Sequence, residues 1–175
     1  MAARLSTAIL ALFLSAASAL AGGAEDNEAG RAAAAAGRLD EALSLFDKAI
    51  ASGELRGQEL AQAYNNRGNI HGLLKDPKRS MQDLNQALLL DPDYASAYYN
   101  RAITHQDLGD LEAAISDYSE VLRLIPESVT ALFFRGVTYE KLGDRGSAVR
   151  DYRRAYELAP EDPLVNAKLT ELGLL

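Results

Sequence analysis

The sequence repeats Pro, Arg and Asp at four positions, each with the same interval of 34 residues. The repeating residues are Pro92, Pro126 and Pro160; Arg67, Arg101 and Arg135; Asp76, Asp110 and Asp144; and Asp83, Asp117 and Asp151. Agreement of four registers at one period indicates a repeated structural unit rather than chance. The units run over residues 61–94, 95–128 and 129–162. Such a chain folds by stacking short units, so that each unit buries apolar surface against its neighbours.

Each unit is predicted to form two helices joined by a turn, as residues 95–128 illustrate. The first helix has a shared face at offsets of 3, 4 and 7 residues, formed by Tyr98, Arg101, Ala102 and His105. Gly109 supplies the left-handed residue that ends this helix, and Asp110 caps the next one. In the first unit Lys75 stands where the other units have glycine. The second helix carries small and large residues on one face, Ala114, Tyr118 and Val121, and Pro126 ends it.

Two further segments flank the three full units. Residues 23–56 match the turn and the second helix of a unit, but their first helix is rich in alanine and carries little that is large enough to bury. We interpret them as a degenerate unit, because terminal repeats are often atypical. Residues 57–60 are extra to the period and are expected to lengthen the loop before the first full unit. Residues 163–175 are predicted to form a capping helix over the last apolar edge.

This 34-residue pattern resembles the tetratricopeptide repeat. The segments Tyr98-Tyr99-Asn100-Arg101-Ala102 and Leu108-Gly109-Asp110-Leu111-Glu112-Ala113-Ala114-Ile115 carry the resemblance, which extends over residues 23–175. The resemblance implies an all-α fold, a right-handed superhelical solenoid of antiparallel helix pairs with a C-terminal capping helix. It also implies a concave groove, lined by the first helices, that accepts an extended or helical peptide.

The face of the first helices beside the packing face supplies the candidate groove residues. They are Gln62, Asn65, Asn66, Asn69, Tyr99, Asn100, Ile103, Phe133, Phe134 and Val137. Along the array, these side chains change from amides, which can hydrogen-bond a peptide backbone, to aromatic rings, which can anchor a peptide by apolar contact. Alternatively, the amides are solvated surface and one Phe belongs to the core, because adjacent helix residues point about 100° apart. Some family members clamp a partner's terminal carboxylate with basic residues, but Asn65, Thr130 and Phe134 stand at those positions here.

The recurring Arg and Asp lie sixteen residues apart within each full unit. The degenerate unit lacks both, with Ala29 and Leu45 at the corresponding positions. This correlation predicts an Arg–carboxylate pair that bridges the two helices of a unit or of adjacent units, since arginine binds a carboxylate through two parallel hydrogen bonds. The alternative is a ladder of arginines that binds anions.

Composition excludes several classes of function. The chain has 18 Lys and Arg against 25 Asp and Glu, a net charge of −7, and no basic cluster of the kind that binds nucleic acid. Cysteine is absent, which excludes disulfides, thiolate catalysis and lipid attachment to a cysteine. His71 and His105 occupy equivalent positions, where the third unit has Tyr139, so we interpret them as packing residues rather than metal ligands. We expect no cofactor and no catalytic site.

Residues 1–21 read as a secretory signal peptide. Arg4 precedes an apolar stretch, and Ala19-Leu20-Ala21 ends the segment with the small residues of a cleavage site. We expect cleavage after Ala21 and a periplasmic or secreted protein without a stable membrane anchor. A retained anchor is the alternative, although the apolar stretch is shorter than the ~20 residues that span a bilayer.

These patterns predict that the chain is a non-enzymatic scaffold or adaptor of the bacterial envelope that binds a protein or peptide. An assembly factor or structural subunit of a secretion or pilus complex is the alternative. A homo-oligomer is compatible with either role.

Overall fold

A computed structural model describes residues 22–175, and these form nine helices and no strand. The helices are α2 (Gly22–Ala35), α3 (Leu39–Ala51), α4 (Gly57–Leu73), α5 (Pro77–Leu90), α6 (Ala95–Leu108), α7 (Leu111–Leu124), α8 (Val129–Leu142), α9 (Arg145–Leu158) and α10 (Pro163–Glu171). The all-α repeat fold expected from the sequence is confirmed. Residues 1–21, the predicted signal peptide, lie outside the described residues.

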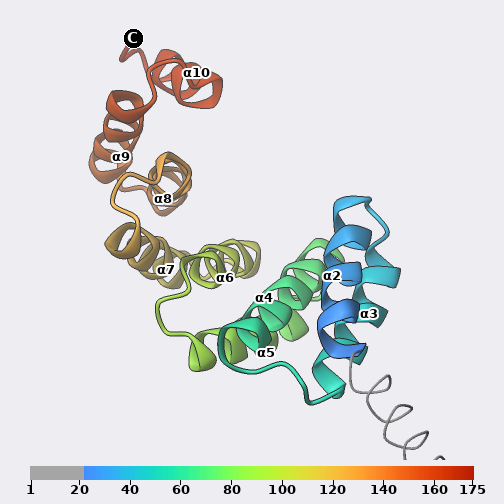
Figure 1. Cartoon of the computed structure of the whole chain (residues 1–175). Helices are drawn as coiled ribbons and strands as arrows, with labels where there is room; N and C mark the ends of the chain where they lie inside the picture. Colours follow the sequence, from blue (N-terminus) through green and yellow to red (C-terminus); the bar gives the residue numbers. More distant parts are fainter. Residues whose placement is uncertain (1–21) are drawn as a thin grey trace, which may run out of the picture.

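The helices pack as successive pairs that follow an arc from α2 to α10 (Figure 1). α2 pairs with α3, α4 with α5, α6 with α7 and α8 with α9, while α10 packs on α9. Each second helix also contacts the first helix of the next pair. Every pair therefore depends on its neighbours to bury its apolar surface.

One large side chain fills the centre of each pair. These residues are Phe46, Leu84, Tyr118 and Tyr152, and each is 0% exposed. A small residue on the partner helix lies opposite each of them: Gly30, Gly68, Ala102 and Gly136. A Cβ atom on Gly136 would lie 2.6 Å from the Tyr152 ring, so only glycine permits this approach.

The turn between the two helices of a unit contains a residue with positive φ. Gly109 and Gly143 adopt φ values of 83° and 87°, as the sequence predicts. Lys75 takes the same role in the first full unit with φ of 60°, in a region that disfavours side chains with a Cβ atom.

The aspartates after these turns differ in what they bond. Asp76 and Asp144 accept hydrogen bonds from the backbone N–H groups of Arg79 and Ser147, as expected of helix caps. Asp110 makes no such bond, so the expected cap is wrong at this position. Its carboxylate lies instead 3.7 Å from the ring of His105.

Residues 57–60 form helix rather than the expected loop, which was wrong. α4 begins at Gly57 and has 17 residues, whereas α6 and α8 have 14 each. Leu60 packs beside Ala49 and Leu55. This apolar contact stabilises an extra helical turn.

None of the helices within residues 22–175 combines the length and the apolar character needed to cross a bilayer.

Candidate functional site

A pocket of about 540 Å³ lies where α4, α5 and α6 meet. Three predicted groove residues line it: Asn69 from α4, and Asn100 and Ile103 from α6. Leu73 also lines it and is 59% exposed, while Ile103 is 36% exposed. The pocket therefore offers accessible amides beside accessible apolar side chains.

Hydroxyl groups and an ion pair complete the pocket. The Ser80 and Thr104 hydroxyls, both buried, are hydrogen-bonded at 2.9 Å. At the rim Lys75 Nζ lies 2.9 Å from an oxygen of Asp107. Since these two charges neutralise each other, the pocket presents little net charge to a ligand.

Asn65, a predicted groove residue, is buried between α4 and α6. It is 4% exposed, and its Oδ1 accepts a hydrogen bond of 2.9 Å from Asn100 Nδ2. Its own Nδ2 donates to Asn66 Oδ1 at 3.3 Å and to the Tyr94 hydroxyl at 3.5 Å. Asn65 thus joins α4 to α6, and its amide is already used within the fold.

Phe133 and Phe134 are both half-buried, and each packs against a different neighbour. The Phe134 ring lies 6.0 Å from the Tyr99 ring and 6.5 Å from the Tyr118 ring. The Phe133 ring lies 5.6 Å from the Tyr152 ring. Phe134 therefore packs between units and Phe133 within its own unit, and neither is a freely exposed anchor.

A smaller pocket of about 220 Å³ lies between α6 and the start of α8. Tyr99 lines it beside Ile125, which is 49% exposed. Burial raises the pKa of the Tyr99 hydroxyl. Val137 is half-buried against the core of α8 and α9, and Gln62 is half-buried near the start of α4, so neither lines either pocket.

The predicted Arg–Asp pairing is confirmed in all three full units. Arg101 donates from Nε and Nη2 to the two oxygens of Asp117 at 2.8 and 2.7 Å. Arg67 with Asp83 and Arg135 with Asp151 repeat this geometry at 2.7 to 2.9 Å. These hydrogen bonds raise the pKa values of the three guanidinium groups.

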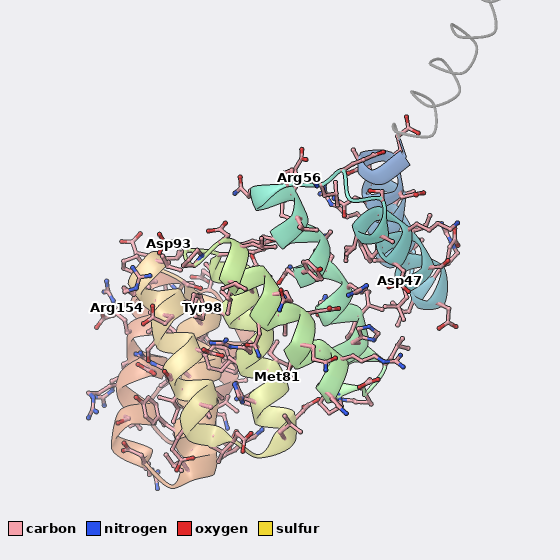
Figure 2. The ribbon with its side chains drawn as sticks, turned by 90° about the horizontal axis from the view of Figure 1, so that it is seen from below. Asp47, Arg56, Met81, Asp93, Tyr98 and Arg154 are labelled. Carbon is pink, nitrogen blue, oxygen red and sulfur yellow. The ribbon has the colours of Figure 1, made fainter. Side chains whose placement is uncertain are left out.

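The third nitrogen of each guanidinium reaches the preceding unit. Nη1 of Arg67, Arg101 and Arg135 donates to Asp47, Asn85 and Ser119 at 2.6, 2.7 and 2.9 Å, respectively. Asp47 lies on α3, where Figure 2 labels it. Each arginine therefore joins three helices, and we call the three sets of contacts the arginine ladder. Each guanidinium uses three of its five N–H donors in these bonds, and two of the three go to a carboxylate that balances its charge, which favours a structural role over an anion-binding one.

Two family models of the tetratricopeptide repeat match the chain, one over residues 61–94 and one over residues 93–161. Together they cover more than half of its length. The chain belongs to the tetratricopeptide-repeat family.

Solved structures of tetratricopeptide-repeat proteins share this fold. YrrB, described as a repeat protein with an unusual peptide-binding site, is 22% identical with a TM-score of 0.71, and the match covers 81% of this chain and 71% of YrrB. MamA is 23% identical with a TM-score of 0.72, covering 80% of each chain. The first repeat domain of Spaghetti (RPAP3), bound to the HSP90 peptide SRMEEVD, is 21% identical with a TM-score of 0.64, covering 67% and 94%. A comparison with curated proteins gave no match.

The tetratricopeptide units contain one repeated contact that the sequence analysis missed. The hydroxyl of Tyr118 donates to Gln106 Oε1 at 3.4 Å, and the hydroxyl of Tyr152 donates to Glu140 Oε2 at 2.6 Å. Both pairs recur at the 34-residue period, which could have revealed them. Because Tyr152 donates to Glu140, this hydrogen bond lowers the pKa of the Glu140 carboxyl.

The two histidines lie beside the arginine ladder. Nε2 of His71 is 4.0 Å from Asp83, and Nε2 of His105 is 3.9 Å from Asp117. Within residues 22–175, no three His, Asp or Glu side chains converge in a way that would hold a metal ion.

Proposed function

We propose that this chain is a non-catalytic scaffold that binds a segment of another protein in the pocket formed by α4, α5 and α6. The observation that carries the proposal is the pocket itself, where Asn69, Leu73 and Ile103 are accessible on one surface. Amides can hydrogen-bond a peptide backbone, and the apolar residues can bury a partner's side chain. Two proteins of similar fold, YrrB and the Spaghetti domain, are described with a peptide-binding site or a bound peptide.

The chemistry of the pocket favours a segment without strong charge. Lys75 and Asp107 neutralise each other at the rim. The peptide in the Spaghetti complex, SRMEEVD, is acidic. In this chain the positions of the carboxylate clamp hold Asn65, Thr130 and Phe134, none of which is basic. The proposed occupant is therefore an internal segment with few charged residues rather than an acidic C-terminus.

Export to the bacterial envelope is the second part of the proposal. The basic start, the apolar stretch and the Ala19-Leu20-Ala21 ending of residues 1–21 support it. A fixed place in an envelope complex and an adaptor role with several clients are both compatible with such a scaffold.

Site-specific photo-crosslinking of the exported full-length chain tests the binding surface. A photoreactive residue at Ile103 is expected to crosslink a protein of the envelope. The same residue at Leu89, which is 75% exposed on α5 and outside the pocket, is the matched control and is expected to give no specific product.

Purified partner and variant chains then measure the energetics. Ile103→Asp and Asn69→Ala are expected to weaken binding at least about tenfold, since a single well-placed contact contributes more than 1 kcal/mol at the centre of an interface. Leu89→Asp should bind as wild type does. Loss of binding by Leu89→Asp with full binding by both pocket variants would place the partner elsewhere and refute the proposal.

A further inference from the structure

The start of α2 is held by a loop that lies 31 residues further along the chain. The backbone N–H of Gly23 donates a hydrogen bond of 2.8 Å to Oε2 of Glu54, in the loop between α3 and α4. This N–H is one of the first four in a helix, which have no partner inside the helix. Glu54 therefore acts as a cap for α2 from a distant part of the sequence.

Gly23 fits this contact because it has no side chain. A Cβ atom at Gly23 would lie 2.4 Å from Ser52 Oγ and 2.9 Å from Glu54 Oε2. A Cβ atom at the neighbouring Gly22 would meet only Asp26, at 3.9 Å. The loop thus approaches Gly23 closely and leaves room at Gly22.

The loop is held by hydrogen bonds within its own segment, without any contribution from α2. Ser52 Oγ donates to the Ala49 carbonyl at 2.7 Å and accepts from the backbone N–H of Glu54 at 3.2 Å. Arg56, which Figure 2 labels beside this loop, donates to the Leu55 carbonyl at 2.8 Å. These bonds hold the loop that carries Glu54, the acceptor for the first turn of α2.

The signal-peptide pattern ends at Ala21, one residue before the segment that this loop holds. We infer that hydrolysis of the Ala21–Gly22 bond creates the mature N-terminus, and that the loop of Ser52 and Glu54 locks this new terminus into the first helix pair. Water and the cell's signal peptidase break the C–N bond, which leaves a carboxylate on Ala21 and an ammonium group on Gly22. This inference rests on the export part of the proposed function.

The two glycines suit both stages of this process. Before folding, Gly22 and Gly23 are poor helix formers, which keeps the scissile bond extended and accessible to the peptidase. After cleavage the ammonium group of Gly22 lies at the positive end of the α2 macrodipole, which is unfavourable. The Glu54 carboxylate, which accepts a hydrogen bond from the adjacent Gly23, offsets this positive charge.

Expression of the full-length chain in a bacterium that exports it, followed by intact-mass measurement and limited trypsin digestion, tests the inference. The expected mass is that of residues 22–175. Gly23→Ala and Glu54→Gln should keep Gly22 as the first residue but be cut after Arg31 in α2 about tenfold faster. The Cβ atom of the first variant displaces the loop, and the second variant replaces a charged hydrogen-bond acceptor by a weaker neutral one, so either change raises the population of the opened helix. Gly22→Ala is the matched control and should digest as wild type does.

The outcomes separate this inference from the rest of the proposal. An uncleaved chain that is absent from the envelope fraction would refute export, while an envelope chain that is uncleaved or cut at another bond would refute this inference alone. Equal cutting after Arg31 in wild type, Gly23→Ala and Glu54→Gln would show that the loop does not lock the terminus. Cutting after Arg154 in α9 reports on global unfolding and should be the same in all four proteins. Binding in the pocket of α4, α5 and α6 is measured independently.

Discussion

At the scale of single residues, the arginine ladder places charged side chains in largely buried positions. Arg101 is 22% exposed at its side chain and Asp117 is 6% exposed, so both charges are largely withdrawn from water. Such charges are costly to bury unless they are paired and hydrogen-bonded. Bidentate geometry and a third bond to the preceding unit meet that condition in each unit.

Removal of one ladder carboxylate is expected to destabilise the fold strongly. Asp117→Ala leaves the Arg101 guanidinium buried without its partner, and loss of one member of a buried pair costs about 3 kcal/mol or more. Urea unfolding measures the change in the free energy of unfolding. Asp93→Ala is the control, because its pair with Arg123 is exposed by 75% and 55% and should contribute little. Equal losses in the two variants would contradict the structural role of the ladder.

His71 makes stability depend on pH near neutrality. Burial lowers its pKa below the ordinary value of 6.5, although the neighbouring Asp83 opposes this shift and Arg67 adds to it. As the pH falls through 6.5, the unfolded chain takes up a proton that the folded chain does not. The free energy of unfolding should therefore decrease from pH 7.5 to pH 5.5. His71→Gln should show a smaller decrease in urea unfolding at the two pH values, and an identical decrease would refute this assignment.

At the scale of elements, the turns within the units differ in strain. Gly109 and Gly143 adopt their positive φ values at little cost, whereas Lys75 adopts φ of 60° against the preference of a residue with a Cβ atom. The ion pair of Lys75 with Asp107 is exposed by 77% and 47%, so it offsets little of this cost. The first full unit therefore has the least favourable turn of the three.

Lys75→Gly is expected to stabilise the chain by up to about 1 kcal/mol, because it relieves the left-handed conformation. Lys141→Gly provides the opposite control, since it places glycine in the last turn of α8 and should destabilise by about 1 kcal/mol. Thermal unfolding of the two variants measures both changes. A lower melting temperature for Lys75→Gly would contradict the interpretation of this turn.

The helices were predictable from the sequence, whereas the orientation of some side chains was not. The 34-residue period located the three full helix pairs, and the spacing of sixteen residues between Arg and Asp predicted their pairing. Residues 57–60 break the period, so the sequence alone did not reveal that Leu60 would find an apolar neighbour and prolong α4. The turning of Asn65 toward Asn100 depends on how closely α6 approaches α4, which is a property of the packed pair.

At the scale of the whole molecule, α10 closes the open end of the array. Val165 and Leu169 are each 1% exposed and join the core that contains Tyr152. Lys168 Nζ lies 3.2 Å from Glu140, which connects α10 to α8. The last core cluster of the described residues is thus covered by a single helix rather than by a pair.

Truncation after Asp162 is expected to destabilise the array by at least about 3 kcal/mol. Val165 and Leu169 each contribute roughly 1.5 kcal/mol or more through burial, and their removal exposes the core of α8 and α9 to water. Urea unfolding and the oligomeric state in solution measure the effect. Leu164→Ser is the control, because Leu164 is 61% exposed on the same helix and should change stability little. An unchanged midpoint in the truncated chain would contradict the capping role.

In the arginine ladder each arginine contacts the unit that precedes it, and the series ends at Arg135. Thirty-four residues after Ser119, the acceptor for Arg135, the sequence places Arg153, and 34 residues after Arg135 it places Leu169. A copy of residues 95–128 inserted after itself would bring an arginine for Ser119 and a serine for Arg135, so the array can lengthen from within. A copy appended after residue 162 would instead set a guanidinium against Arg153. Duplication inside the array is therefore the route by which a chain of this design can acquire a longer binding surface.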